Sequence, residues 1–71
     1  LIISDKTFQT NGELFYPNST DNPNFQSWVP EFFGNTMLVN GVIWPKMKVK
    51  QQLYRFVLLN ACNSRFLNIW F

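Results

Sequence analysis

Short apolar runs separated by turn residues make up most of the chain, which is the pattern of β-strands. The expected strands occupy residues 1–3, 36–39, 42–44, 54–59 and 65–71. No window places apolar residues at i, i+3, i+4 and i+7 between helix caps, so no helix is expected. Strands at intervals of about eight to twelve residues are typical of a sandwich or barrel. The pattern therefore predicts an all-β fold.

The pair Asn40-Gly41 lies between two apolar runs, residues 36–39 and 42–44. A two-residue type I′ turn needs positive φ at both central positions, which Asn and Gly adopt at little cost. We therefore expect a tight antiparallel hairpin. Residues 10–12, Thr-Asn-Gly, form a second cluster with turn chemistry.

Polar and apolar residues alternate over residues 46–50. The alternation predicts a strand with three lysines on one face and Met47 and Val49 on the other. A solvated edge strand, where lysines discourage pairing with other chains, is favoured over a basic binding patch. Residues 54–59 contain one charge, Arg55, and predict a strand buried on nearly both faces.

Residues 16–30 differ from the rest of the chain because they are rich in Pro, Asn, Ser, Thr and Asp. Pro17, Pro23 and Pro30 each remove a backbone donor, so an irregular connection is expected here. A connection of this length is usually a linker or a functional loop.

The composition is that of a piece of a larger core. Seventy-one residues bury only about 60% of their unfolded surface on folding, yet 46% of this chain is apolar and 18% aromatic. One Cys and no His leave no internal disulfide or metal to compensate. The chain starts with strand residues, without an initiator Met or a leader. We therefore expect an internal segment of a longer protein.

The net charge of the chain and the length of its apolar runs argue against nucleic acid and a membrane as partners. The net charge of +2 is too small to indicate nucleic acid, and no basic groove accompanies the aromatic residues. No apolar run approaches the roughly 20 residues that span a bilayer. The aromatic side chains are expected to pack in a core.

The residues needed for catalysis are missing from the sequence. A Ser or Cys nucleophile needs a general base, and the chain has no His. The four acidic residues are widely spaced, so no carboxylate pair is indicated. Cys62, as the single Cys, cannot build a copper or zinc site alone. We expect no catalytic, cofactor-binding or metal-binding residue in the segment.

Three positions remain as candidates for other roles. Cys62 could be a reactive thiol or could pair outside the segment, and a small buried apolar residue is the favoured interpretation. Asn18 begins an Asn-Ser-Thr glycosylation sequon, which matters only if the protein is secreted. Glu31 follows a proline and precedes two phenylalanines, and could face a substrate. A solvated loop acid is its favoured interpretation.

Two long strings, SWVPEFFGNTMLVNGVIWP and YRFVLLNACNSRF, resemble the multicopper oxidases of the bacterial spore-coat laccase type. That group includes bilirubin oxidase and plant ferroxidase-like proteins, and the likeness covers nearly the whole chain. Two positions depart from the family pattern. Val57 stands where the family often has Arg, and Cys62 stands where it has Ser. Neither change alters the strand pattern.

The resemblance implies an incomplete part of a cupredoxin-like Greek-key β-sandwich. It implies that residues 1–10 are the terminal strand of a first cupredoxin-like domain and that residues 11–34 connect the domains. Residues 35–71 would be the opening strands of the second domain. The segment would be structural scaffold, because the family's His-x-His and His-Cys-His copper motifs are absent from it.

For the whole protein the resemblance implies a copper enzyme that oxidises a reducing substrate and reduces dioxygen to water. Its other partners would be the remaining cupredoxin domains, and its location would be secreted, in the cell wall or spore coat. Phenols, bilirubin and ferrous iron stay open as substrates, and Glu31 could help to hold iron in a ferroxidase-like parent. The alternative is a small non-catalytic β-rich interaction module, which would have to protect its edge strands.

Overall fold

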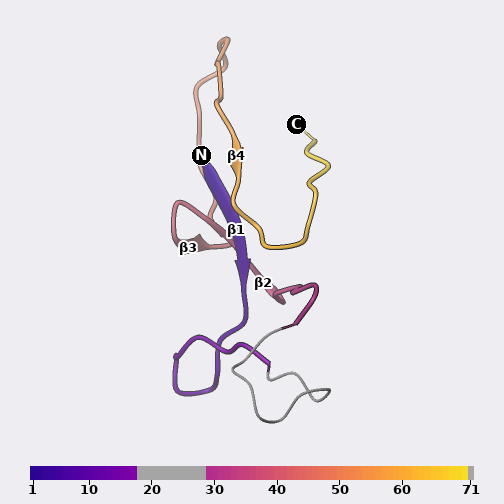
Figure 1. Cartoon of the computed structure of the whole chain (residues 1–71). Helices are drawn as coiled ribbons and strands as arrows, with labels where there is room; N and C mark the ends of the chain where they lie inside the picture. The colour runs from indigo at the N-terminus through magenta and orange to yellow at the C-terminus, as the bar shows by residue number, and fades with distance from the viewer. Residues whose placement is uncertain (18–28, 71) are drawn as a thin grey trace.

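The computed structural model describes residues 1–17 and 29–70 (Figure 1). These residues form four strands and no helix. The strands are β1 (Ile2–Lys6), β2 (Thr36–Val39), β3 (Val42–Ile43) and β4 (Leu59–Asn60). The prediction of an all-β fold is confirmed for the described part of the chain.

The strands form one mixed sheet in the order β3-β2-β1-β4. β1 lies antiparallel to β2, with Ile3 opposite Val39, and parallel to β4, with Ile2 opposite Leu59. A small mixed sheet of this kind is consistent with part of a cupredoxin-like sandwich. The pairing also brings β1, which lies within residues 1–10, into the same sheet as β2, β3 and β4, which lie within residues 35–71.

The hairpin predicted at Asn40-Gly41 is confirmed. Both residues have positive φ, 51° and 78°, and β2 and β3 pair antiparallel on either side of them. β3 is one residue shorter than expected because Trp44 has a φ of 42°, outside the β region. The Trp44 N–H still donates to the carbonyl of Met37 at 3.1 Å.

The turn expected at residues 10–12 is also present. Phe8 and Leu14 pair in an isolated antiparallel bridge on either side of it. Gly12 supplies a φ of 88° at the bend, a conformation that most side chains resist. Of the irregular connection expected over residues 16–30, residues 18–28 lie outside the described residues.

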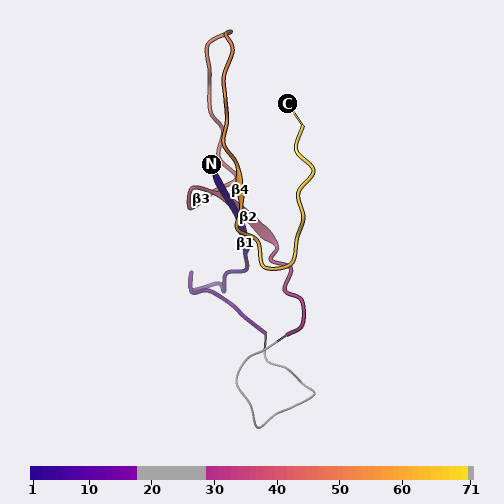
Figure 2. The same cartoon turned by 45° about the horizontal axis from the view of Figure 1, so that its top comes forward.

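Three predicted strands are wrong for this segment. Residues 46–50 join no ladder and are exposed on both faces, and within residues 54–59 only Leu59 pairs. These two stretches run side by side as a long arm that leaves the sheet, with a bend at residues 51–52 (Figures 1 and 2). Residues 65–70 also join no ladder. A strand needs regular hydrogen bonds to a neighbouring strand, and the described residues form no ladder at these places, although the two stretches of the arm lie side by side.

The interior of the segment is small. Among the described residues, Phe32 and Leu38 are the buried hydrophobic side chains. The accessible surface is 6634 Å², whereas a folded protein of 8.4 kDa exposes about 4600 Å². The radius of gyration is 15.8 Å, against about 11 Å for a compact chain of this length. Most apolar side chains of the segment therefore remain available for packing.

Candidate functional site

A buried carboxylate is the polar centre of the structure. Asp5 lies on β1 and is 2% exposed. Its Oδ2 accepts hydrogen bonds from the Gly34 N–H at 2.7 Å and from Arg65 Nε at 3.0 Å. Arg65 Nη2 donates to the Gly34 carbonyl at 3.0 Å. We call Asp5, Gly34 and Arg65 the Asp5 cluster. It joins three stretches of chain that are distant in sequence.

Glycine at position 34 allows this arrangement. A Cβ on Gly34 would lie 2.5 Å from the backbone nitrogen of Lys6 and 2.7 Å from its carbonyl carbon. Real Cβ atoms do not approach backbone this closely. The loop backbone therefore packs directly on β1, and this close approach lets the Gly34 N–H reach Asp5.

Further contacts hold the Arg65 end of the Asp5 cluster. The Phe32 N–H donates to Ser64 Oγ at 2.8 Å, and Asn60 Nδ2 donates to the Arg65 carbonyl at 2.8 Å. The Arg65 guanidinium lies 5.2 Å from the centre of the Phe33 ring, within cation–π range. These contacts help to hold the Arg65 guanidinium beside the Asp5 carboxylate.

Burial and hydrogen bonding act in opposite directions on Asp5. Burial alone would raise the pKa of Asp5, but the hydrogen bonds from the Gly34 N–H and Arg65 outweigh it and hold the pKa below its ordinary value of 3.8. The pKa of the half-buried Cys62 thiol is raised above 9.0 by burial and by the neighbouring Asp5 carboxylate. Cys62 is therefore a protonated, weakly nucleophilic thiol at neutral pH.

Glu31 and the lysines of the arm do not join the Asp5 cluster. Glu31 lies exposed in the bend before the buried Phe32. The described residues contain no group of three or more His, Cys, Asp or Glu side chains that could hold a metal ion. Asn18 lies outside the described residues. Of the lysines on the arm, all three are exposed.

The donor set of the segment does not fit a copper site. Copper centres with imidazole and thiolate ligands need several such donors, and the 71 residues contain no His and one Cys. That Cys is Cys62, whose thiol is held protonated.

In the described part of the chain, no helix is long and apolar enough to cross a membrane.

The sequence reasoning missed the Asp5 cluster. Asp5 and Arg65 are separated by 60 positions, and no local pattern connects them. A weak signal did exist: Asp5 is a charged residue inside an otherwise β-like run, and such a residue needs a partner when its strand becomes central. Which partner it finds depends on the parallel pairing of β4 beside β1.

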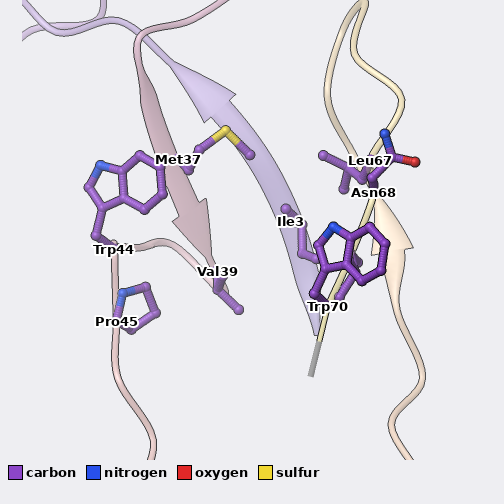
Figure 3. Close-up of a pocket in the computed structure, with 9 residues that line it drawn as sticks. Ile3, Met37, Val39, Trp44, Pro45, Leu67, Asn68 and Trp70 are labelled. Carbon is purple, nitrogen blue, oxygen red and sulfur yellow. The ribbon is translucent and has the colours of Figure 1, made fainter.

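An apolar groove lies on one face of the sheet (Figure 3). Its volume is about 340 Å³. Ile3 and Val39, which are opposite each other in the β1–β2 register, lie between its two sides. The remaining lining residues are Met37, Trp44, Pro45, Leu67, Asn68, Ile69 and Trp70. Figure 3 shows the Trp44 and Trp70 indoles on opposite sides of this groove.

The fold and site together define an all-β segment in which the buried Asp5 pairs with the partly exposed Arg65, and whose one Cys and absent His do not make a copper site. No family model matches the chain. It is similar to the laccase of Bacillus subtilis (44% identity over 97% of this chain), to the laccase of Bacillus stratosphericus (45% over 92%) and to Multicopper oxidase LPR1 of Arabidopsis thaliana (39% over 100%). The chain belongs to the multicopper oxidase family. It spans only 12% to 14% of the length of these relatives.

Proposed function

We propose that this segment is structural scaffold within a multicopper oxidase that oxidises a reducing substrate and reduces dioxygen to water. The proposal rests on the identity of 39% to 45% to laccases and a multicopper oxidase over nearly the whole segment. Copper in the whole protein follows from the family. Its ligands would lie outside residues 1–71, because these residues contain no His.

The scaffold role is supported by the Asp5 cluster. Its hydrogen bonds tie β1 to the loop before β2 and to the turn after β4. Such a cluster fixes the relative position of three chain segments without presenting a reactive group to solvent. In the whole oxidase the partners of this scaffold would be the remaining cupredoxin domains, with the substrate and dioxygen bound elsewhere.

The alternative of a self-standing interaction module has less support. Only two hydrophobic side chains are buried among the described residues, and the accessible surface exceeds that of a folded protein of this mass by about 2000 Å². Expression of the 71 residues alone separates the two ideas. A cooperative unfolding transition in a monomer would favour the module, and aggregation would favour the scaffold.

The oxidase role is tested on the full-length protein. We expect bound copper and oxygen consumption with a phenol or with ferrous iron, and their absence would refute an oxidase.

The scaffold role is tested by Arg65→Met, with Lys48→Met on the exposed arm as the matched control. We expect Arg65→Met to lower the yield of folded protein while kcat/KM per bound copper stays within about twofold. A large loss of kcat/KM at unchanged yield would place the segment in the chemistry.

A role for Glu31 in holding ferrous iron stays a prediction. Its exposure makes it accessible, but no metal-binding group surrounds it in the described structure. Glu31→Ala in the full-length enzyme should leave turnover of a bulky phenol unchanged. A selective loss of kcat/KM with ferrous iron would support a docking role, and equal rates would remove it.

The domain boundaries, the secreted location and glycosylation of Asn18 also stay predictions. A boundary within residues 11–34 would divide strands that pair in one sheet, since β1 lies between β2 and β4. Limited proteolysis of the full-length protein tests it: two stable products that separate after cleavage in this range would support the boundary. Peptide mass spectrometry of the mature protein would detect a glycan on Asn18.

A further inference from the structure

One oxygen of the buried Asp5 carboxylate lacks a donor. Oδ2 accepts hydrogen bonds from the Gly34 N–H and from Arg65 Nε, whereas Oδ1 meets no donor in good hydrogen-bond geometry among the described residues. The side chain of Asp5 is 0% exposed. A buried charged oxygen without a partner is costly, so a donor close to Oδ1 would be strongly favoured.

The turn after β4 holds Cys62 against β1. The Ala61 N–H donates to the Ile3 carbonyl at 2.7 Å, which ties the start of the turn to β1. Within the turn, the Cys62 N–H donates to Asn60 Oδ1 at 3.0 Å, and Asn60 Nδ2 donates to the Arg65 carbonyl at 2.8 Å. One turn therefore positions both Cys62 and Arg65 beside the same strand.

The Cys62 thiol has a proton to donate and a poor acceptor in its present orientation. Its Sγ lies 3.9 Å from the Ile3 carbonyl oxygen, which is long for a hydrogen bond, and that oxygen already accepts the Ala61 N–H. Burial and then the Asp5 carboxylate raise the pKa of the thiol, so it stays protonated at neutral pH. A protonated thiol has one hydrogen to donate, and a carboxylate is a better acceptor than an occupied carbonyl.

The carboxylate also responds to this thiol. Burial raises the pKa of Asp5, and the Gly34 N–H, Arg65 and the Cys62 thiol each lower it as hydrogen-bond donors. Because Oδ2 already has two donors, Oδ1 is the oxygen that the thiol can serve.

We propose that the Cys62 thiol donates a hydrogen bond to Asp5 Oδ1 and is the third donor to this carboxylate, beside the Gly34 N–H and Arg65. The hydrogen bond gives Cys62 a positioning role that apolar packing alone does not supply. It adds a contact between the turn after β4 and β1, and it does not depend on the oxidase activity.

Infrared spectroscopy of the S–H stretch in the full-length protein tests the hydrogen bond directly. The difference between the spectra of the native protein and Cys62→Ser isolates the Cys62 band. A thiol absorbs at lower frequency when its acceptor is stronger, so we expect the band to move to higher frequency in Asp5→Asn, where a neutral amide replaces the carboxylate. Leu53→Ala, at a fully exposed position on the arm, is the matched control and should leave the band unchanged.

Hydrogen exchange of the peptide that contains Gly34 tests what the hydrogen bond does for the structure. Cys62→Ala removes the donor and should speed exchange in this peptide at least about threefold. Cys62→Ser keeps a donor of similar size, so its exchange should stay within about twofold of the native rate.

The proposal is overturned by any of three results. The first is an S–H band that does not move in Asp5→Asn. The second is equally fast exchange in Cys62→Ser and Cys62→Ala, because donation would then not be what matters. The third is native exchange in Cys62→Ala, which would assign Oδ1 to another donor such as a buried water. None of these measurements uses oxygen consumption, so the hydrogen bond and the oxidase role are judged separately.

Discussion

Arg65→Met in the full-length protein removes the guanidinium from the Asp5 cluster while keeping much of the aliphatic length. Asp5 is 2% exposed, so its carboxylate would stay buried with the Gly34 N–H as its remaining strong donor. Removing one partner of a fully buried ion pair costs about 3–5 kcal/mol. The Arg65 side chain is 39% exposed, so solvent screening reduces this figure, and we expect a loss of about 2 kcal/mol.

A double-mutant cycle with Asp5→Asn isolates the interaction. The assay is urea unfolding of the full-length protein, together with hydrogen exchange of the peptide that covers β2 and the loop before it. We expect the two changes together to cost about 1 kcal/mol less than the sum of the single changes. Strict additivity, or unchanged exchange at Gly34, would refute the assignment of Asp5 and Arg65 as a coupled pair.

The stability difference measured in this cycle should also depend on pH. Because the pKa of Asp5 is lowered on folding, its ionised form contributes stability that is present above the ordinary value of 3.8. This contribution is lost as the pH falls through the lower pKa of the folded state. The native protein and Arg65→Met should therefore differ most at neutral pH and converge in strong acid. A difference that grows towards low pH would contradict this sign.

Three further results are expected. Gly34→Ala should destabilise the full-length protein by about 3 kcal/mol or more in urea unfolding, because the new Cβ would lie 2.5 Å from the Lys6 backbone nitrogen. A cost under about 1 kcal/mol would show that the loop can move away from β1. Gly41→Val should cost about 1 kcal/mol or more through its φ of 78°, although the site has open space, and Gly41→Asn should cost much less. Cys62 should react with iodoacetamide at pH 8 at least about tenfold more slowly in the native protein than in urea, since its pKa is raised, and equal rates would argue against a shielded thiol.

The features predicted from sequence are those set by neighbouring residues. The Asn40-Gly41 turn follows from the backbone preferences of two adjacent residues, and it forms as expected. For the alternating lysine stretch, the solvated lysines were predicted correctly, but the stretch forms no strand, and Met47 and Val49 are exposed as well. Alternation describes which side chains tolerate water, whereas a strand also needs a partner backbone, and residues 46–50 have none among the described strands.

The candidate site was harder to predict because it depends on long-range pairing. Asp5 meets Arg65 only because β4 lies parallel to β1 and the chain then turns back. Neither strand position could be inferred from composition or periodicity. The need for glycine at position 34 likewise arises from the approach of Lys6, 28 positions earlier in the chain.

The central place of β1 in the sheet has a consequence for synthesis. β1 is made first, but β2 begins at Thr36 and β4 at Leu59, so β1 has neither neighbour when it leaves the ribosome. At about 5–20 residues per second, the 60 positions from Asp5 to Arg65 take about 3–12 seconds. A charged residue inside an apolar strand is a feature that discourages such a strand from pairing with other chains while its own neighbours are missing. Asp5, whose carboxylate later joins Arg65 in the folded sheet, is a charge of this kind on β1.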